Sequence, residues 1–77
     1  MTKYDLVGVD GNAFSIMGYV TRAMKEVHCD RETIDNYLKD AKSSDYNHLL
    51  MVSMEMIQFC NEQYNEQYGI YDEEDDF

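Results

Sequence analysis

This 77-residue chain has two cysteines and two histidines, the residue types that most often serve as nucleophile, general base or zinc ligand. They are Cys29, Cys60, His28 and His48. A zinc site usually takes two ligands from one turn, at Cys-x-x-Cys or His-x-x-x-His spacing, and neither spacing occurs here. Neighbouring residues such as His28 and Cys29 point in different directions on a helix end or loop, so they do not predict a nucleophile beside its base. We therefore predict no catalytic residue, no metal site and no cofactor site, and expect that the protein is not an enzyme.

Carboxylates are the second chemical feature, and they gather in the C-terminal third. The net charge is −10, and from residue 46 onward the chain has eight acidic residues and no lysine or arginine. These are Glu55, Glu62, Glu66, Asp72, Glu73, Glu74, Asp75 and Asp76. Binding to a phosphate backbone needs clustered Lys and Arg, so we expect no direct contact with nucleic acid. A protein with a basic surface is the complementary partner.

Length and composition indicate one small folded domain. Hydrophobic residues make up 44% of the chain, which is enough for a core, but a domain of this size buries only about 60% of the surface of its unfolded chain. No apolar stretch approaches the roughly 20 residues of a membrane span, and no secretory signal precedes the first turn. We expect a cytoplasmic protein that has no membrane contact and whose two cysteines are free thiols.

Three helices are predicted by spacing and capping residues. Asn12 is a good N-cap for a helix over 13–27, and Asp30 for a short helix that follows it. Gly18 inside the first helix suggests close approach by a neighbouring segment. The Ser43-Ser44-Asp45 stretch then precedes a long helix from Tyr46 to about Tyr64.

The third predicted helix has an unusually wide apolar arc. At 100° per residue its apolar side chains cover about 220°, twice the width of an ordinary core stripe. Two interpretations follow: the helix is central and covered by the others, or another chain covers part of it. Met51, Met54 and Met56 keep the second interpretation open, because thioether side chains suit adaptable binding surfaces as well as the filling of gaps in a core.

The two ends of the chain complete the expected fold. Residues 4–9 are expected to be extended up to a turn at Asp10-Gly11, and residues 68–71 are a candidate partner strand. The predicted fold class is therefore mainly α, a small three-helix domain over residues 1–71 with a short two-stranded ribbon as an optional addition. Residues 72–77 are expected to form a flexible acidic tail.

Two stretches resemble a family of small uncharacterised proteins carried by bacteria and their phages. They are LVGVDGNAFSIMGYVTRAMKE, residues 6–26, and SDYNHLL, residues 44–50. In that family a Gly-x-Asp-Gly-Asn-Ala-Phe turn opens the first helix and an Asp-Tyr-x-His-Leu-Leu segment opens the last. The resemblance covers the first two thirds of the chain and implies a phage or mobile-element origin, but no established activity.

The stretch DEEDDF, residues 72–77, also resembles the acidic tip of single-stranded DNA-binding proteins, in which acidic residues precede a final phenylalanine. The Ile-Pro of many bacterial members is missing. In that group the carboxylates meet a basic rim and the aromatic ring enters a pocket, which implies a similar role for Phe77. A purely solvating tail is the alternative, since acidic termini are common.

Together these features predict a non-enzymatic protein that binds a basic, nucleic-acid-binding surface of a partner and inhibits or modulates it by nucleic-acid mimicry. An inhibitor of a bacterial defence nuclease is one concrete form. The alternative is a self-associating helical module, a homodimer through the broad apolar face of the third helix. The predicted partner-binding residues are Glu55, Glu62, Glu66, Asp72, Glu73, Glu74, Asp75, Asp76, Phe77, Met51 and Met54.

Overall fold

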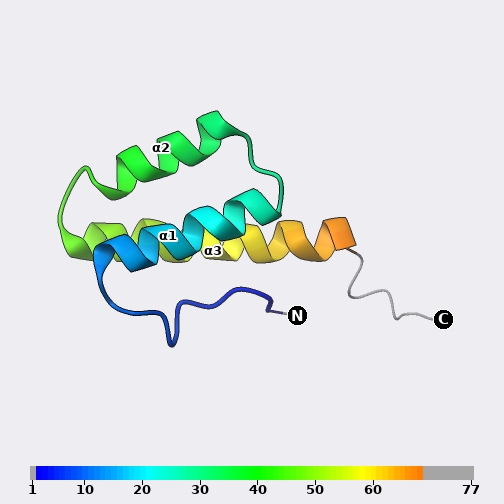
Figure 1. Ribbon diagram of the computed structural model, residues 1–77, viewed down its shortest axis with the longest axis horizontal. Coiled ribbons are helices and arrows are strands. Elements are labelled where there is room, and N and C mark those ends of the chain that lie inside the picture. The colour runs from blue at the N-terminus through cyan, green and yellow to red at the C-terminus, as the bar shows by residue number, and fades with distance from the viewer. Residues whose placement is uncertain (1, 69–77) are drawn as a thin grey trace.

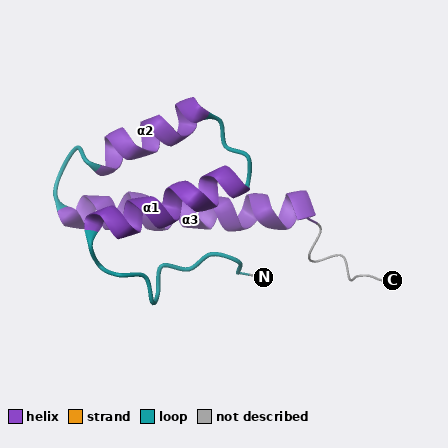
Figure 2. Ribbon diagram, viewed as in Figure 1, coloured by secondary structure: helices purple, strands orange, loops and turns teal. Residues whose placement is uncertain are grey.

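Three helices make up most of the described chain in the computed structural model, which describes residues 2–68. Helix α1 spans Ala13–Glu26, α2 spans Arg31–Ala41 and α3 spans Tyr46–Tyr68. In Figure 1, α1 lies across α3, with α2 on one side of the pair and the N-terminal segment on the other. The described residues contain helices and loops but no strand (Figure 2). The mainly α, three-helix fold predicted from the sequence is confirmed.

Side-chain caps set the start of the first two helices. The Asn12 side chain accepts a hydrogen bond from the Phe14 amide at 2.7 Å, and the Asp30 side chain accepts one from the Thr33 amide at 2.9 Å. Each cap satisfies an amide that has no partner inside the helix. Both predicted N-caps are therefore confirmed.

Helix α1 ends in a Schellman motif built around a histidine. The amide of Cys29 donates to the Met24 carbonyl at 2.9 Å, and the amide of His28 donates to the Lys25 carbonyl at 3.0 Å. His28 has a φ of 69°, the left-handed conformation that this motif requires. The chain reverses there, and this directs α2 back along α1.

One face of α3 forms the floor of the core. Its buried residues Leu49, Ser53, Ile57 and Cys60 recur at helical spacing. Helices α1 and α2 each pack more extensively on α3 than on each other. The interpretation of α3 as the central helix is therefore correct, although Met51, Met54 and Phe59 stay exposed.

The N-terminal segment is held on α3 by a side-chain amide. Asn61 Oδ1 accepts from the amides of Lys3 and Tyr4 at 2.9 and 2.7 Å, and Asn61 Nδ2 donates to the Tyr4 carbonyl at 2.9 Å. The buried Tyr4 ring meets Tyr64 edge-on, with ring centres 5.8 Å apart, and its hydroxyl donates to Glu26 at 2.5 Å. The segment therefore pairs with a helix side chain rather than with a strand.

The expected ribbon is wrong where the structure describes it. Residues 4–9 form no strand, and the chain already turns at Leu6–Val9, where the Val9 amide donates to the Leu6 carbonyl at 3.0 Å. Gly8, with a φ of 91°, supplies the positive φ of a type II turn, ahead of the expected Asp10-Gly11 turn. Tyr68, expected in a strand, belongs to α3, and residues 69–71 lie outside the described residues.

Helix α3 extends past the expected end near Tyr64 because its last turns find tertiary partners. Gln67 Nε2 donates to the Val27 carbonyl at 2.8 Å. The rings of Tyr64 and Tyr68, one turn apart, lie 4.6 Å from each other. Such contacts outweigh the weak helix preference of a polar sequence.

Two residues of α1 differ from what the sequence pattern suggests. Phe14 continues the apolar spacing of the helix, yet it is 80% exposed, because at 100° per residue it falls about 120° away from the fully buried Val20. Gly18 is not closely approached, since a Cβ added there would meet no atom within 4 Å. Gly18 instead lines an open groove between α1 and α2.

We predict that Gly18→Ala raises the free energy of unfolding by about 0.5–1 kcal/mol, because alanine loses less backbone entropy in a helix. Urea denaturation measures the change. Gly8→Ala is the matched control and should destabilise, since its backbone has a φ of 91°. A destabilised Gly18→Ala variant would show that this position has a close neighbour.

Candidate functional site

The outward face of α3 brings together four of the residues predicted to bind a partner. At 100° per residue, Met51, Glu55, Glu62 and Glu66 fall within an arc of about 60°. They extend over about 22 Å of the helix axis at 1.5 Å per residue. All four are exposed. They form one solvent-facing stripe, which we call the acidic stripe.

Met54 lies at the edge of the acidic stripe, beside a groove that the sequence did not predict. The groove has a volume of about 470 Å³ and separates α3 from the N-terminal segment. Leu6, Val7 and Ile57 contribute apolar walls, and Met54 is 62% exposed. A partner's apolar side chain fits this chemistry, next to the carboxylates.

Nothing on α3 neutralises the acidic stripe. The helix contains no lysine or arginine, and neither ion pair found within residues 2–68 includes Glu55, Glu62 or Glu66. Glu66 lies in the last turns, where the helix dipole disfavours a negative charge. Glu62 and Glu66 are four residues apart and repel each other. The stripe therefore presents unpaired carboxylates to solvent.

The other six predicted binding residues belong to the C-terminal end of the chain. Residues 72–77 lie outside the described part of the chain. They are Asp72, Glu73, Glu74, Asp75, Asp76 and Phe77. Their predicted role stays a prediction.

The cysteines are free thiols with differing access to solvent. Cys60 is fully buried, and burial raises the pKa of its thiol to about 12. Burial, and then the charge of Asp30, also raises the pKa of the half-buried Cys29. Since the thiolate is the nucleophilic form, neither environment activates a cysteine. Residues 2–68 contain no cluster of three or more His, Cys, Asp or Glu side chains that could hold a metal ion.

No protein-family model matches the chain, and no curated protein or solved structure is significantly similar to it. Within residues 2–68, none of the three helices has the length and apolar character needed to span a lipid bilayer. The surfaces of the molecule are therefore the guide to its function.

A second groove, between α1 and α2, was also missed by the sequence reasoning. It is lined at one end by Phe14 and Lys42 and farther along by Thr21, Lys25 and Leu38. One signal was available, because five of the six lysines and arginines lie between residues 22 and 42. The clustering of basic residues does not show how far apart α1 and α2 lie on α3. The groove is therefore seen only in the tertiary structure.

His48 forms a polar link between α3 and the end of α2. Its Nε2 atom lies 3.0 Å from Asp40 Oδ1, and its side chain is 27% exposed. The hydrogen bond to Asp40 raises the pKa of His48 above its usual 6.5, despite a smaller opposing effect of burial.

We predict that this pair makes stability pH-dependent. Because the His48 pKa is raised in the folded state, its stabilising contribution is fully present below pH 6.5 and is lost as pH rises through the folded-state pKa. Asp40→Asn should return the His48 pKa toward 6.5, whereas Asp35→Asn should leave it unchanged. An NMR titration of the imidazole measures both, and an unshifted His48 in the unaltered protein would contradict the prediction.

Proposed function

We propose that this protein binds a basic surface of a nucleic-acid-processing partner through the acidic stripe of α3 and inhibits or modulates it by occupying the place of nucleic acid. The observation that carries the proposal is the stripe itself: Glu55, Glu62 and Glu66 face solvent on a helix without a single lysine or arginine. The carboxylates are spaced along one rigid helix. They present repeated negative charges to a basic groove on the partner, as the phosphates of nucleic acid do. We propose that the protein is encoded by a phage or mobile element. One concrete form of its function is inhibition of a bacterial defence nuclease.

Local stability does not account for these glutamates. A negative charge near the C-terminal end of a helix costs about 0.3–1 kcal/mol, and the repulsion between Glu62 and Glu66 adds a few tenths. Both costs are relieved when cationic groups approach. The arrangement of these glutamates therefore favours the state in which α3 is bound to a basic partner over the unbound state.

The exposed apolar side chains supply the second part of an interface. Charges at an interface rim mainly increase the association rate and specificity, whereas buried apolar anchors contribute most of the affinity. Met51 is 52% exposed and Met54 is 62% exposed, and the groove beside Met54 offers a place for a partner's side chain. Phe77 and residues 72–76 extend the proposed acidic surface by their sequence alone.

We predict that reversing two charges on the stripe weakens partner binding. The variant Glu62→Lys with Glu66→Lys should bind about tenfold more weakly at low salt, since each exposed charge pair contributes about 0.2–1 kcal/mol. Affinity capture from a host lysate, followed by mass spectrometry and a binding titration of the captured protein, measures the effect. Added duplex nucleic acid should compete, and rising salt should weaken binding steeply.

The matched control reverses two exposed acidic residues on α2, Glu32→Lys with Asp35→Lys, and should retain binding. The stripe variant removes the unfavourable charges at the end of α3, so it should be at least as stable as the unaltered chain. Loss of binding would then not reflect unfolding. Binding that ignores salt, or that both variants lose equally, would refute mimicry through the stripe.

The second candidate function is a self-associating module, and it rests on the exposed Met51, Met54 and Phe59 of α3. A copy of the chain would cover these apolar side chains, although the glutamates of the acidic stripe lie among them and a net charge of −10 on each copy opposes association. Sedimentation equilibrium distinguishes the two functions. If a dimer forms and Met54→Asp converts it to a monomer, while the contacts of Lys3 and Tyr4 with Asn61 stay intact by NMR, the module is supported. A monomer at millimolar concentration would exclude it.

A further inference from the structure

The groove between α1 and α2 exists because the two helices pack more on α3 than on each other. It consists of two adjoining hollows of about 400 and 460 Å³ that share Thr21, Lys25 and Leu38. One hollow extends to Phe14 and Lys42, and the other to Cys29 and Arg31. We call the two together the α1–α2 groove.

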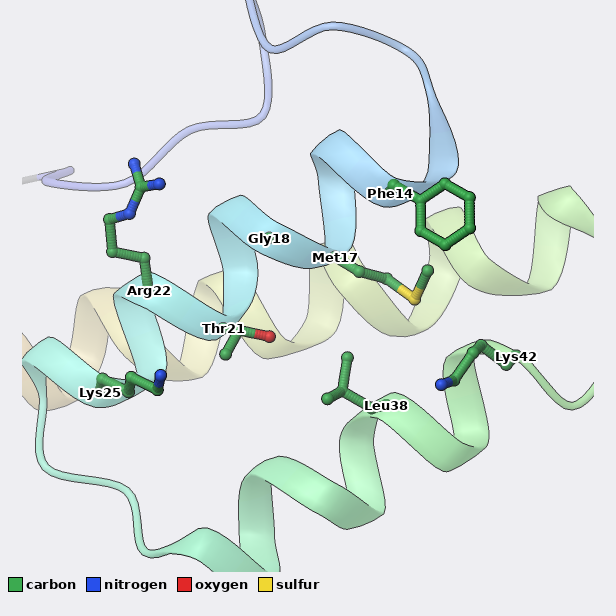
Figure 3. Close-up of a pocket in the computed structure, with 8 residues that line it drawn as sticks. All are labelled: Phe14, Met17, Gly18, Thr21, Arg22, Lys25, Leu38 and Lys42. Carbon is green, nitrogen blue, oxygen red and sulfur yellow. The ribbon is translucent and has the colours of Figure 1, made fainter.

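The α1–α2 groove is positively charged in an acidic protein. Four of the six lysines and arginines of the chain line it: Arg22, Lys25, Arg31 and Lys42. Asp35 is the one acidic residue in its lining, and it lies 3.9 Å from Arg31. In Figure 3, Lys25 and Lys42 lie at opposite ends of the hollow, while Arg22 points away from α2. An anionic ligand is the complement of this lining.

The floor of the groove is apolar, with one unsatisfied polar group. Figure 3 shows Leu38 of α2 directed toward Met17 and Thr21 of α1. The Thr21 hydroxyl oxygen is buried and has no hydrogen-bond partner within the described structure. An unpaired buried hydroxyl is uncommon, because it loses its hydrogen bonds to water without replacement.

We propose that the acidic C-terminal segment of this same chain, residues 69–77, docks in the α1–α2 groove. The described chain ends beside the connection between α1 and α2: Gln67 bonds to the Val27 carbonyl, and the Tyr68 hydroxyl lies 3.5 Å from His28 Nε2. Both partners belong to the connection between α1 and α2, next to Cys29. Because Cys29 lines one end of the groove, the nine residues that follow start near that end.

The segment has sufficient length and the required chemistry. Nine extended residues span up to about 30 Å, whereas α1 rises about 17 Å from Lys25 to Phe14. Residues 72–76 bring five carboxylates to the lysines and arginines, and Tyr71 and Phe77 bring aromatic rings to the apolar floor. A short tether gives an effective concentration of the order of millimolar, so weak docking suffices for occupancy.

This inference is independent of the proposed function. The groove lies between α1 and α2, and its lining contains no residue of the acidic stripe. Failure to capture a partner leaves docking in place, and failure of docking leaves the stripe exposed. If docking and partner binding both occur, residues 69–77 bind either in the α1–α2 groove or to the partner at any one time.

The test uses the full chain and a full-length variant in which residues 72–76 carry amides: Asp72→Asn, Glu73→Gln, Glu74→Gln, Asp75→Asn and Asp76→Asn. We expect ¹⁵N amide shifts to change at Thr21, Lys25, Leu38 and Lys42, and expect the same changes in the unaltered chain at 0.5 M salt. Lys25→Glu with Lys42→Glu should also release the segment. Lys39→Glu, an exposed position outside the groove lining, is the control and should not.

Carbodiimide cross-linking of an equal mixture of ¹⁴N and ¹⁵N protein identifies the occupant. Links from Lys25 or Lys42 to residues 72–76 within one isotopic chain would support the proposal. Links between differently labelled chains would overturn it in favour of a second copy. Links to Lys39 as frequent as those to Lys25 and Lys42, or unchanged amide shifts in the neutralised variant, would also overturn it.

Discussion

A single face of α3 has to accommodate α1, α2 and the N-terminal segment at once. Ser53, in the middle of this face, is fully buried and shares a 2.6 Å hydrogen bond with the hydroxyl of the buried Tyr37 on α2. A small side chain at this position lets the tyrosine reach the helix, and the bond satisfies both polar groups. Asn61, two turns later, performs the equivalent task for the backbone of Lys3 and Tyr4. These two contacts fix how α2 and the N-terminal segment align on α3, because apolar packing alone is not directional.

Sharing that face has consequences for the outside of the molecule. Once the inner side of α3 is covered, no segment within residues 2–68 remains to cover Met51 and Met54, and they stay exposed. The same crowding separates α1 from α2 along their far sides, because each helix packs mainly on α3. The exposed methionines beside the acidic stripe and the α1–α2 groove therefore have the same origin. The core is too small to bury every apolar residue.

Negative and positive charges lie on different surfaces of the molecule. Glu55, Glu62 and Glu66 face solvent on α3, and most of the lysines and arginines line the opposite α1–α2 groove. In a chain with net charge −10, this separation concentrates the few positive charges instead of spreading them as partners for the glutamates. Each surface then attracts ligands of opposite sign, which is the basis both for the proposed basic partner and for the proposed docking of residues 69–77.

Local chemistry in the sequence determined the three helices, their N-caps at Asn12 and Asp30, and the exposure of the acidic residues of α3, because capping and helical periodicity act within a few residues. Tertiary structure alone decided the rest. Tyr68 is helical since Gln67 finds the Val27 carbonyl, the N-terminal segment pairs with Asn61 rather than with a strand, and Gly18 borders a groove instead of a close contact. These outcomes depend on which segments meet in space, and contacts between residues 40 to 58 positions apart leave no periodic trace in the sequence.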